Sequence, residues 1–359
     1  MSNLRDPSSA ASCEVPHQQM SWRRKLIFRL VALAMATLVS ITAGEVLLRI
    51  FVDPEVKRLA SYDETIGWRG RPHGSGIYIR KIDDIRVPFR YNNLGFRDED
   101  VGPKPADRHR IMMLGDSFIE NLEVEYSKTF PFLLEKLVTA RLPNWEVTVV
   151  GSQGYSTAQE LLAFRRFHEL VSPDVVLLCF YCGNDFEDNL RRKFAFLDND
   201  GELRIPQNQE PKWTHLARSV QRWLYESSHV VYLLKNSLQS IANLNLAPES
   251  KSAAEADDQY KQQITAQLIS RLAEEVGATG AEFGVVVIPF RDHLVAGNRE
   301  PQSFVTAVCA ESQISHLDLS PLLDRDDFFE TDIHFNAEGH QVVAQAIHDF
   351  LATSLASLR

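Results

Sequence analysis

The sequence predicts an α/β protein, a three-layer α/β/α sandwich with a central parallel sheet, preceded by one transmembrane helix. Two patterns lead to this prediction. From residue 109 onward, continuous apolar runs alternate with segments of helical spacing, and one long apolar stretch lies near the N-terminus. Apolar strands between helices are typical of a parallel sheet covered on both faces. The 359 residues, 44% of them apolar, suffice for one large domain with additional segments.

The N-terminal region predicts a membrane anchor. Residues 1–25 are polar and end in the basic cluster Arg23-Arg24-Lys25, so we expect a disordered cytoplasmic tail. The apolar stretch 26–51 follows, and its part 26–44 counts 19 residues (44 − 26 + 1), long enough for a spanning helix. Basic residues beside a spanning helix stay on the cytoplasmic side of the membrane. This helix would therefore act as a signal-anchor that places the rest of the chain in the periplasm.

A cleaved signal peptide and a buried core helix are the two alternatives for this stretch. Ile41 and Ala43 stand at positions −3 and −1 before Gly44, which makes a poor cleavage site. A core helix is unexpected so close to a basic cluster.

Residues 52–108 are rich in Gly, Pro, Arg and aromatic residues, with short strands predicted at 77–79 and 86–91. We interpret them as a preface segment that packs on the main domain, residues 109–359. In that domain, strands are predicted at 110–114, 145–150, 174–181, 281–289 and 316–319, and helices at 130–142, 157–170, 302–311 and 337–355.

Residues 191–275 break this alternation and are predicted to form a helical insertion or cap. This stretch holds the aromatic residues Trp213, Trp223, Tyr225 and Tyr232.

Charge and cysteine content narrow the function classes. The net charge of −10 argues against nucleic acid as a partner, because phosphate binding needs a basic face.

Four cysteines are too few for a disulfide scaffold. Cys179 and Cys182 are predicted as buried thiols, with a disulfide to Cys309 left open. Asp185 and Asp188 lack further ligands at metal spacing, and we expect neither metal nor cofactor.

Polar residues follow the predicted strands where each strand ends. Ser117 comes after the first strand, Gly154 after the second and Asn184 after the third, while Asp332 and His334 precede the last helix. The carboxyl ends of parallel strands meet at one edge of a sheet, where ligands bind. We therefore expect these residues to converge.

These residue types suit ester hydrolysis. A serine hydroxyl becomes a nucleophile when an imidazole accepts its proton and a carboxylate orients that imidazole, which fits Ser117, His334 and Asp332. Oxyanion donors would be the backbone N–H groups of Ser117 and Gly154 and the side-chain amide of Asn184.

Glu330 is the alternative acid. A short aspartate two residues before His334 can turn back to the imidazole, whereas Glu330 would need a helical turn to reach it, so Asp332 is favoured.

At these positions the sequence resembles the SGNH hydrolases, also called GDSL-type esterases. The resemblance extends over about two thirds of the chain, roughly residues 110–355, and rests on four blocks in the family's order: Gly115-Asp116-Ser117, Gly154, Gly183-Asn184-Asp185 and Asp332 with His334. Residues 154–160 and 335–340 look like the bacterial members anchored by a single helix. In one departure, Thr331 occupies the position three before His334 where the family acid usually lies.

The resemblance implies a flavodoxin-like sandwich and a serine esterase domain on the extracytoplasmic side of the membrane. The expected substrates are acyl esters, above all O-acetyl groups, of an envelope glycan or lipid, hydrolysed through an acyl-Ser117 intermediate. Two alternatives remain: an O-acyltransferase that uses the same acyl-enzyme, and an inactive envelope protein of the same fold.

Overall fold

The computed structural model describes residues 21–51, 60–191, 193–206, 220, 224, 228–231, 233–234 and 251–354. A five-stranded parallel sheet forms its centre, in the order β11-β10-β7-β5-β6. Its strands are β5 (His109–Gly115), β6 (Trp145–Gly151), β7 (Val175–Tyr181), β10 (Glu282–Ile288) and β11 (Ser315–Asp318). The prediction of a parallel sheet is confirmed, and all five predicted strands are present.

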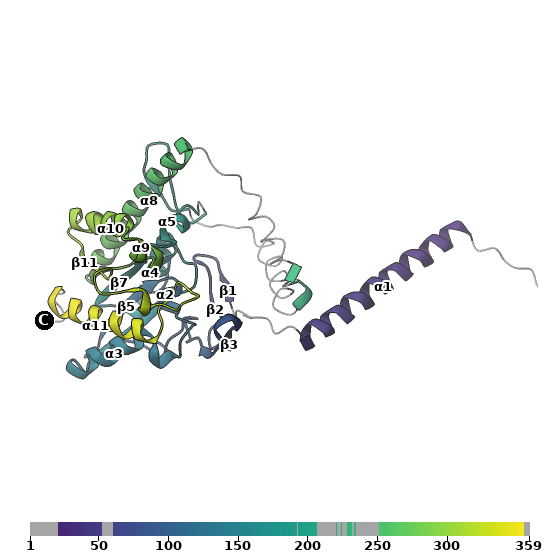
Figure 1. Cartoon of the computed structure of the whole chain (residues 1–359), viewed down its shortest axis with the longest axis horizontal. Coiled ribbons are helices and arrows are strands. Elements are labelled where there is room, and N and C mark those ends of the chain that lie inside the picture. Colours follow the sequence, from purple (N-terminus) through teal and green to yellow (C-terminus); the bar gives the residue numbers. More distant parts are fainter. Residues whose placement is uncertain are drawn as a thin grey trace, which may run out of the picture.

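Helices cover both faces of this sheet (Figure 1). One face carries α3 (Phe130–Arg141) and α11 (Ala337–Ser354), and the other carries α4 (Thr157–Val171), α8 (Lys251–Ala278) and α10 (Glu300–Glu311). Successive residues of a strand point to opposite faces. Accordingly Met112 packs on the α4 side and Met113 on the α3 side, both fully buried. This arrangement is the predicted three-layer sandwich.

The segment before the sandwich forms two antiparallel hairpins. The first pairs β1 (Ala60–Asp63) with β2 (Gly67–Gly70), and the second pairs β3 (Ser75–Arg80) with β4 (Ile85–Arg90). The second hairpin contains both strands predicted here. Its side chains Tyr78, Val87 and Phe89 form a small core with Leu122, which lies beyond β5. The hairpin is therefore packed on the loop that follows the first strand of the main sheet.

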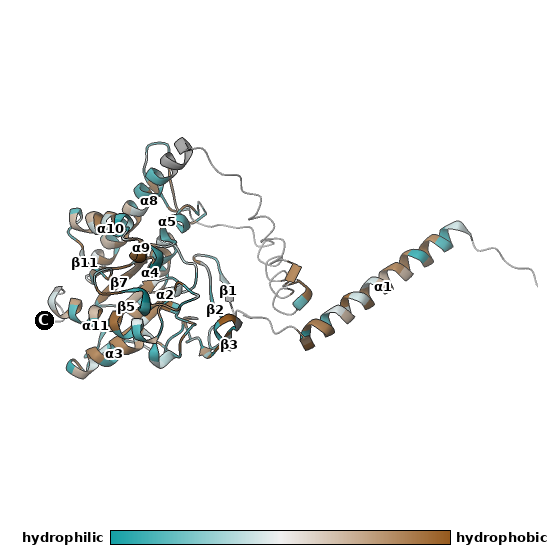
Figure 2. Ribbon diagram, viewed as in Figure 1, coloured by the Kyte–Doolittle hydropathy of each residue, from teal (hydrophilic) through white to brown (hydrophobic). Residues whose placement is uncertain are grey.

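The N-terminal apolar stretch forms a single helix, α1 (Trp22–Phe51), which begins four residues before the predicted stretch. None of its residues is buried, and its mean hydropathy over an 18-residue window is 2.1. The helix stands apart from the sandwich (Figure 1) and is hydrophobic along most of its length, with a polar start (Figure 2). It is long and apolar enough to cross a membrane, and the chain resumes at Ala60.

The middle of the chain contains a short hairpin, β8 (Phe196–Leu197) with β9 (Leu203–Arg204). Trp213, Trp223, Tyr225 and Tyr232 lie outside the described residues. Helix α8, which includes the last part of the predicted insertion, packs against α4 and β10 as part of one layer of the sandwich. That the remainder of residues 191–275 covers the site stays a prediction.

The described cysteines are buried free thiols. Cys179, Cys182 and Cys309 form no disulfide with one another. Burial raises the pKa of the Cys179 thiol well above its ordinary value, which leaves it protonated and unreactive at neutral pH.

Candidate active site

The turn after β5 presents Ser117. This serine is the first residue of a short helix, α2 (Ser117–Glu120), and Asp116 caps the helix by accepting a hydrogen bond from the N–H of Phe118 at 2.9 Å. Gly115 allows the close packing beneath the turn, because a Cβ there would lie 2.5 Å from Ile119. The cap and the glycine together fix the direction of the serine side chain.

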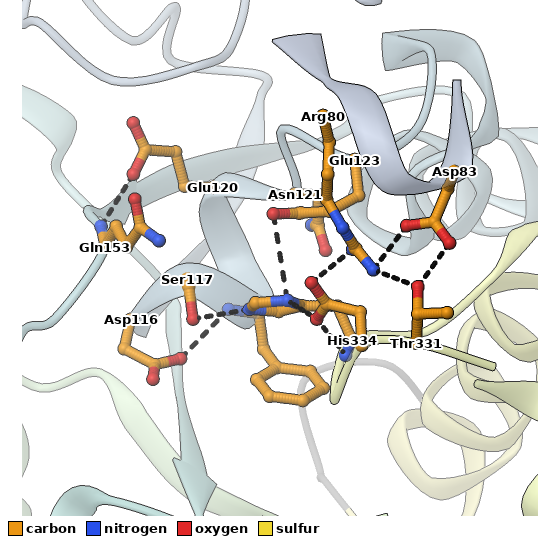
Figure 3. A network of polar contacts seen from close by, with 12 residues as sticks. Arg80, Asp83, Asp116, Ser117, Glu120, Asn121, Glu123, Gln153, Thr331 and His334 are labelled. Carbon is orange, nitrogen blue, oxygen red and sulfur yellow. Dashed lines mark hydrogen bonds and ion pairs between the residues drawn. The ribbon is translucent and has the colours of Figure 1, made fainter. Parts of the chain in front are cut away.

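His334 lies against this serine. Its Nε2 is 2.8 Å from Oγ of Ser117 (Figure 3). Its Nδ1 is 2.5 Å from Oδ1 of Asp332. The same Asp332 oxygen accepts a hydrogen bond from the backbone N–H of His334 at 2.9 Å, so the carboxylate is held by its own turn. The neutral imidazole with its proton on Nδ1 can therefore donate to Asp332 and accept from Ser117.

Glu330, the alternative acid, does not contact the imidazole. Its side chain is exposed, and its backbone carbonyl accepts a hydrogen bond from Arg291. Arg291 also donates to the carbonyls of Phe329 at 3.0 Å and Asp332 at 2.8 Å, and these bonds hold the backbone of the loop that bears Glu330. The geometry therefore brings Asp332 to His334, and not Glu330.

The surrounding charges favour the protonated imidazole. Burial acts to lower the pKa of His334, but the carboxylates of Glu123 and Asp332 outweigh it and raise that pKa to about 9. Burial likewise acts to raise the pKa of Asp332, but the hydrogen bond from His334 and the charge of Arg80 help to lower it to about 2. The imidazolium formed by proton transfer from Ser117 would thus be well stabilised.

The backbone N–H groups of the two predicted oxyanion donors, Ser117 and Gly154, have no partner within the described residues. Ser117 is at a helix start, where N–H groups lack helical partners. Gly154 has a φ of 74°, in the left-handed region that favours glycine. Its carbonyl accepts a hydrogen bond from Arg191 at 2.5 Å, which holds the turn in place.

Asn184 joins the loop after β7 to the serine turn. Its Nδ2 donates to Oδ2 of Asp116 at 3.2 Å and to Oδ2 of Asp188 at 3.1 Å. Asn184 thus lies beside the turn that bears Ser117. Both amide hydrogens are engaged by carboxylates, however, so an oxyanion role requires the release of one of them.

Two charged residues of this site were not predicted from the sequence. Arg80 donates from Nη1 to the outer oxygen of Asp332, and Oε1 of Glu123 lies 3.7 Å from Nδ1 of His334 (Figure 3). The one sequence signal for Arg80 was its place at the end of a strand-like run.

A cavity of about 370 Å³ opens beside the loop that carries Asn184. Its walls combine aromatic and charged side chains, among them Phe186, Phe290, Phe304, Glu187 and Glu300. Phe290 follows β10 and Gly183, also in the lining, follows β7, so the cavity lies at the carboxyl edge of the sheet.

The chain resembles proteins of known family and structure. The profile of the GDSL-like Lipase/Acylhydrolase family matches residues 113–342. No curated protein matches the chain. Similar solved structures include a psychrotrophic esterase from Pseudoalteromonas sp. inhibited by monoethylphosphonate (12% identity, 69% of this chain and 98% of that one, TM-score 0.41). A GDSL-like lipase from Bacteroides thetaiotaomicron (12%, 71% and 93%, TM-score 0.39) and a lipase/acylhydrolase from Enterococcus faecalis (14%, 68% and 95%, TM-score 0.38) are also similar.

Proposed function

Since this chain belongs to the GDSL-like lipase/acylhydrolase family and is a hydrolase of ester bonds, we propose that it removes acyl groups, chiefly O-acetyl groups, from an envelope glycan or lipid. Ser117 would be the nucleophile, His334 the base and Asp332 the acid that orients it. The observation that carries this proposal is the contact of 2.8 Å between Oγ of Ser117 and Nε2 of His334.

The proposed reaction has two halves. The hydroxyl of Ser117 passes its proton to His334 while its oxygen attacks the ester carbon, and the new C–O bond gives a tetrahedral oxyanion. The N–H groups of Ser117 and Gly154 would bind that oxyanion. Collapse breaks the ester C–O bond, and His334 returns the proton to the departing alcohol oxygen. Water then attacks the acyl carbon as His334 takes its proton, the bond from that carbon to Oγ of Ser117 breaks, and His334 returns the proton to Oγ as the acid leaves.

Asn184 is proposed as the third oxyanion donor. Its amide lies between the carboxylates of Asp116 and Asp188. Burial raises the pKa of the Asp188 carboxyl to about 6. A negative substrate oxygen placed near the amide would compete with these two acceptors for one N–H. A donor of this kind typically contributes about 10²–10³-fold to turnover.

The cavity beside Gly183 is the proposed place for the part of the substrate that carries the acyl group. Phe290 and Phe304 offer apolar walls, while Glu187 and Glu300 offer hydrogen-bond acceptors. A pocket that combines apolar walls with a few polar groups suits a sugar unit, which has both C–H faces and hydroxyl donors.

Turnover of a short-chain aryl acetate by the full-length chain in detergent tests this function. We expect release of the aryl alcohol and of an equal amount of acetate, because water captures the acyl-serine. Addition of a glycan with free hydroxyl groups should not divert the acetyl group. Acetylated glycan as the main product would identify an acyltransferase instead, and no aryl alcohol in either condition would identify an inactive protein.

The proposed location is a single-pass anchor with the catalytic domain outside the cytoplasm. Helix α1 starts next to Arg23, Arg24 and Lys25, and basic residues of this kind remain on the cytoplasmic side. A reporter that works only after export should therefore be active when it is fused after Arg359. A reporter that works only in the cytoplasm should be active when it is fused before Trp22. The reverse pair of results would contradict the proposed orientation.

A further inference from the structure

Strand β3 reaches the site although it lies outside the family match, which begins at residue 113. We propose that β3 completes the ester-hydrolysis site: Arg80 is a positioning residue for Asp332, and Tyr78 is a positioning residue for Glu123, a second carboxylate beside His334. The proposal rests on the function proposed above for Ser117 and His334.

Arg80 binds the side of Asp332 that faces away from the histidine. The two carboxylate oxygens are divided, because Oδ1 contacts His334 while Oδ2 accepts from Nη1 of Arg80. The second guanidinium nitrogen donates to Thr331 at 2.7 Å and pairs with Asp83 at 2.5 Å (Figure 3). A planar guanidinium held at both nitrogens fixes the plane of the carboxylate it binds.

Glu123 faces the same imidazole nitrogen as Asp332. Its Oε1 is 3.7 Å from Nδ1 of His334, and its side chain is 4% exposed. Burial and the charge of the nearby Glu123 carboxylate raise the pKa of the Tyr78 hydroxyl above its ordinary value, which places this hydroxyl beside Glu123. Arg97 fixes the loop that bears Glu123 by donating to the carbonyls of Asn121 and Val124.

Both positioning side chains come from one face of the strand. Tyr78 and Arg80 are two residues apart in β3, and residues at this spacing point to the same side of a strand. The hairpin is held in place by its small core with Leu122, which directly precedes Glu123. One docked strand thus holds both carboxylates that flank the histidine.

The charges around His334 make this arrangement testable. The imidazole faces Asp332 from its own loop, Glu123 from the loop after α2 and Asp116 from the cap of α2. Arg80 offsets the charge of Asp332, and Arg97 and His340 lie farther out. Removing Glu123 takes away a negative charge, whereas removing Arg80 takes away a positive one. The two changes should therefore move the proton affinity of His334 in opposite directions.

The test is the pH profile of kcat/KM for the aryl acetate, measured on the full-length chain in detergent. Activity rises as the base loses its proton, so the acid limb of the profile reports the pKa of His334. That limb should lie at alkaline pH in the unaltered chain, because this pKa is raised to about 9. Glu123→Gln should move it down by about 1 pH unit or more. Arg80→Gln should move it up by a few tenths and lower kcat by roughly 10-fold with little change in KM.

Matched variants control for charge alone. Glu125→Gln, on the same loop but exposed, and Arg86→Gln, exposed on the same hairpin, should leave the limb in place. Arg80→Lys keeps the charge and should keep the limb near its normal position while kcat falls. If Glu123→Gln does not fold, Tyr78→Phe decides: it removes the hydroxyl beside that carboxylate, and the limb should move up.

The proposal would be overturned if the acid limb of Glu123→Gln, Arg80→Gln and Tyr78→Phe lies at the same pH as that of the unaltered chain. This holds however much turnover these variants lose. Labelling by a fluorophosphonate separates this result from a failure of the proposed function. A labelled wild-type chain with an unmoved limb refutes only the role of β3, whereas an unlabelled wild-type chain refutes the serine mechanism.

Discussion

Ser117→Ala is expected to abolish covalent labelling by a fluorophosphonate and to lower turnover of an aryl ester by on the order of 10⁴-fold or more. The substitution removes the one oxygen that lies 2.8 Å from Nε2 of His334, so no acyl-enzyme can form. Substrate binding and the oxyanion donors would still accelerate ester hydrolysis slightly over the rate in water. The measurement is gel fluorescence after labelling, combined with steady-state kinetics.

The fold should survive this change. Ser117 is the first residue of α2, where alanine is tolerated because the cap is supplied by Asp116. A thermal melt within a few degrees of the wild type is therefore expected. Ser152→Ala is the matched control, because this serine is also buried but its hydroxyl points to Glu120, and it should keep the label. Labelling that persists in Ser117→Ala would show that another residue is the nucleophile.

Asp332→Asn is expected to lower kcat by on the order of 10²–10⁴-fold while the protein stays folded. The carboxylate accepts from Nδ1 of His334 at 2.5 Å and thereby keeps the free electron pair on Nε2, next to Ser117. An amide at this position can donate to Nδ1, which favours the tautomer that cannot accept the serine proton. It also removes the charge that stabilises the imidazolium.

Glu330→Gln is the partner measurement. The Glu330 side chain is exposed and only its backbone carbonyl is held, by Arg291, so kcat should change little. Steady-state kinetics of both variants on one substrate decide between the two acids. A crippled Glu330→Gln beside a near-normal Asp332→Asn would mean that the loop rearranges in solution and that the acid assignment is wrong.

The central sandwich was predictable because its signals are local. The strand β7 is apolar throughout, which indicates burial on both faces, and the polar residue Asn184 lies in the loop that follows that strand. Helix α8 shows the limit of such signals. Its buried residues Ile264, Leu268 and Leu272 recur every four positions, which indicates a helix with one buried face. Periodicity does not tell which surface that face meets.

The contact between Asp332 and His334 could be predicted from the sequence, whereas the contacts around these two residues could not. Asp332 is two residues from His334, so its reach can be judged from the chain alone. Arg80 and Asp332 are 252 positions apart, and their contact depends on how the hairpin docks. Asn184 could be placed from its position after a strand, but the competing acceptors Asp116 and Asp188 come from different turns. Tertiary packing, and not residue type, decided these features.

The short interval between α1 and the first hairpin restricts where the enzyme can work. Eight residues (59 − 52 + 1) separate Phe51 from Ala60, and a chain of this length reaches at most about 30 Å. If α1 spans a bilayer, as proposed, this interval keeps Ala60 and the hairpin that begins there within a thin shell above the lipid. Within that shell, esters attached to the same surface are met by a two-dimensional search at high effective concentration. An ester free in bulk solution gains nothing from such a tether, which agrees with the proposal that the substrates are acyl groups bound to a surface.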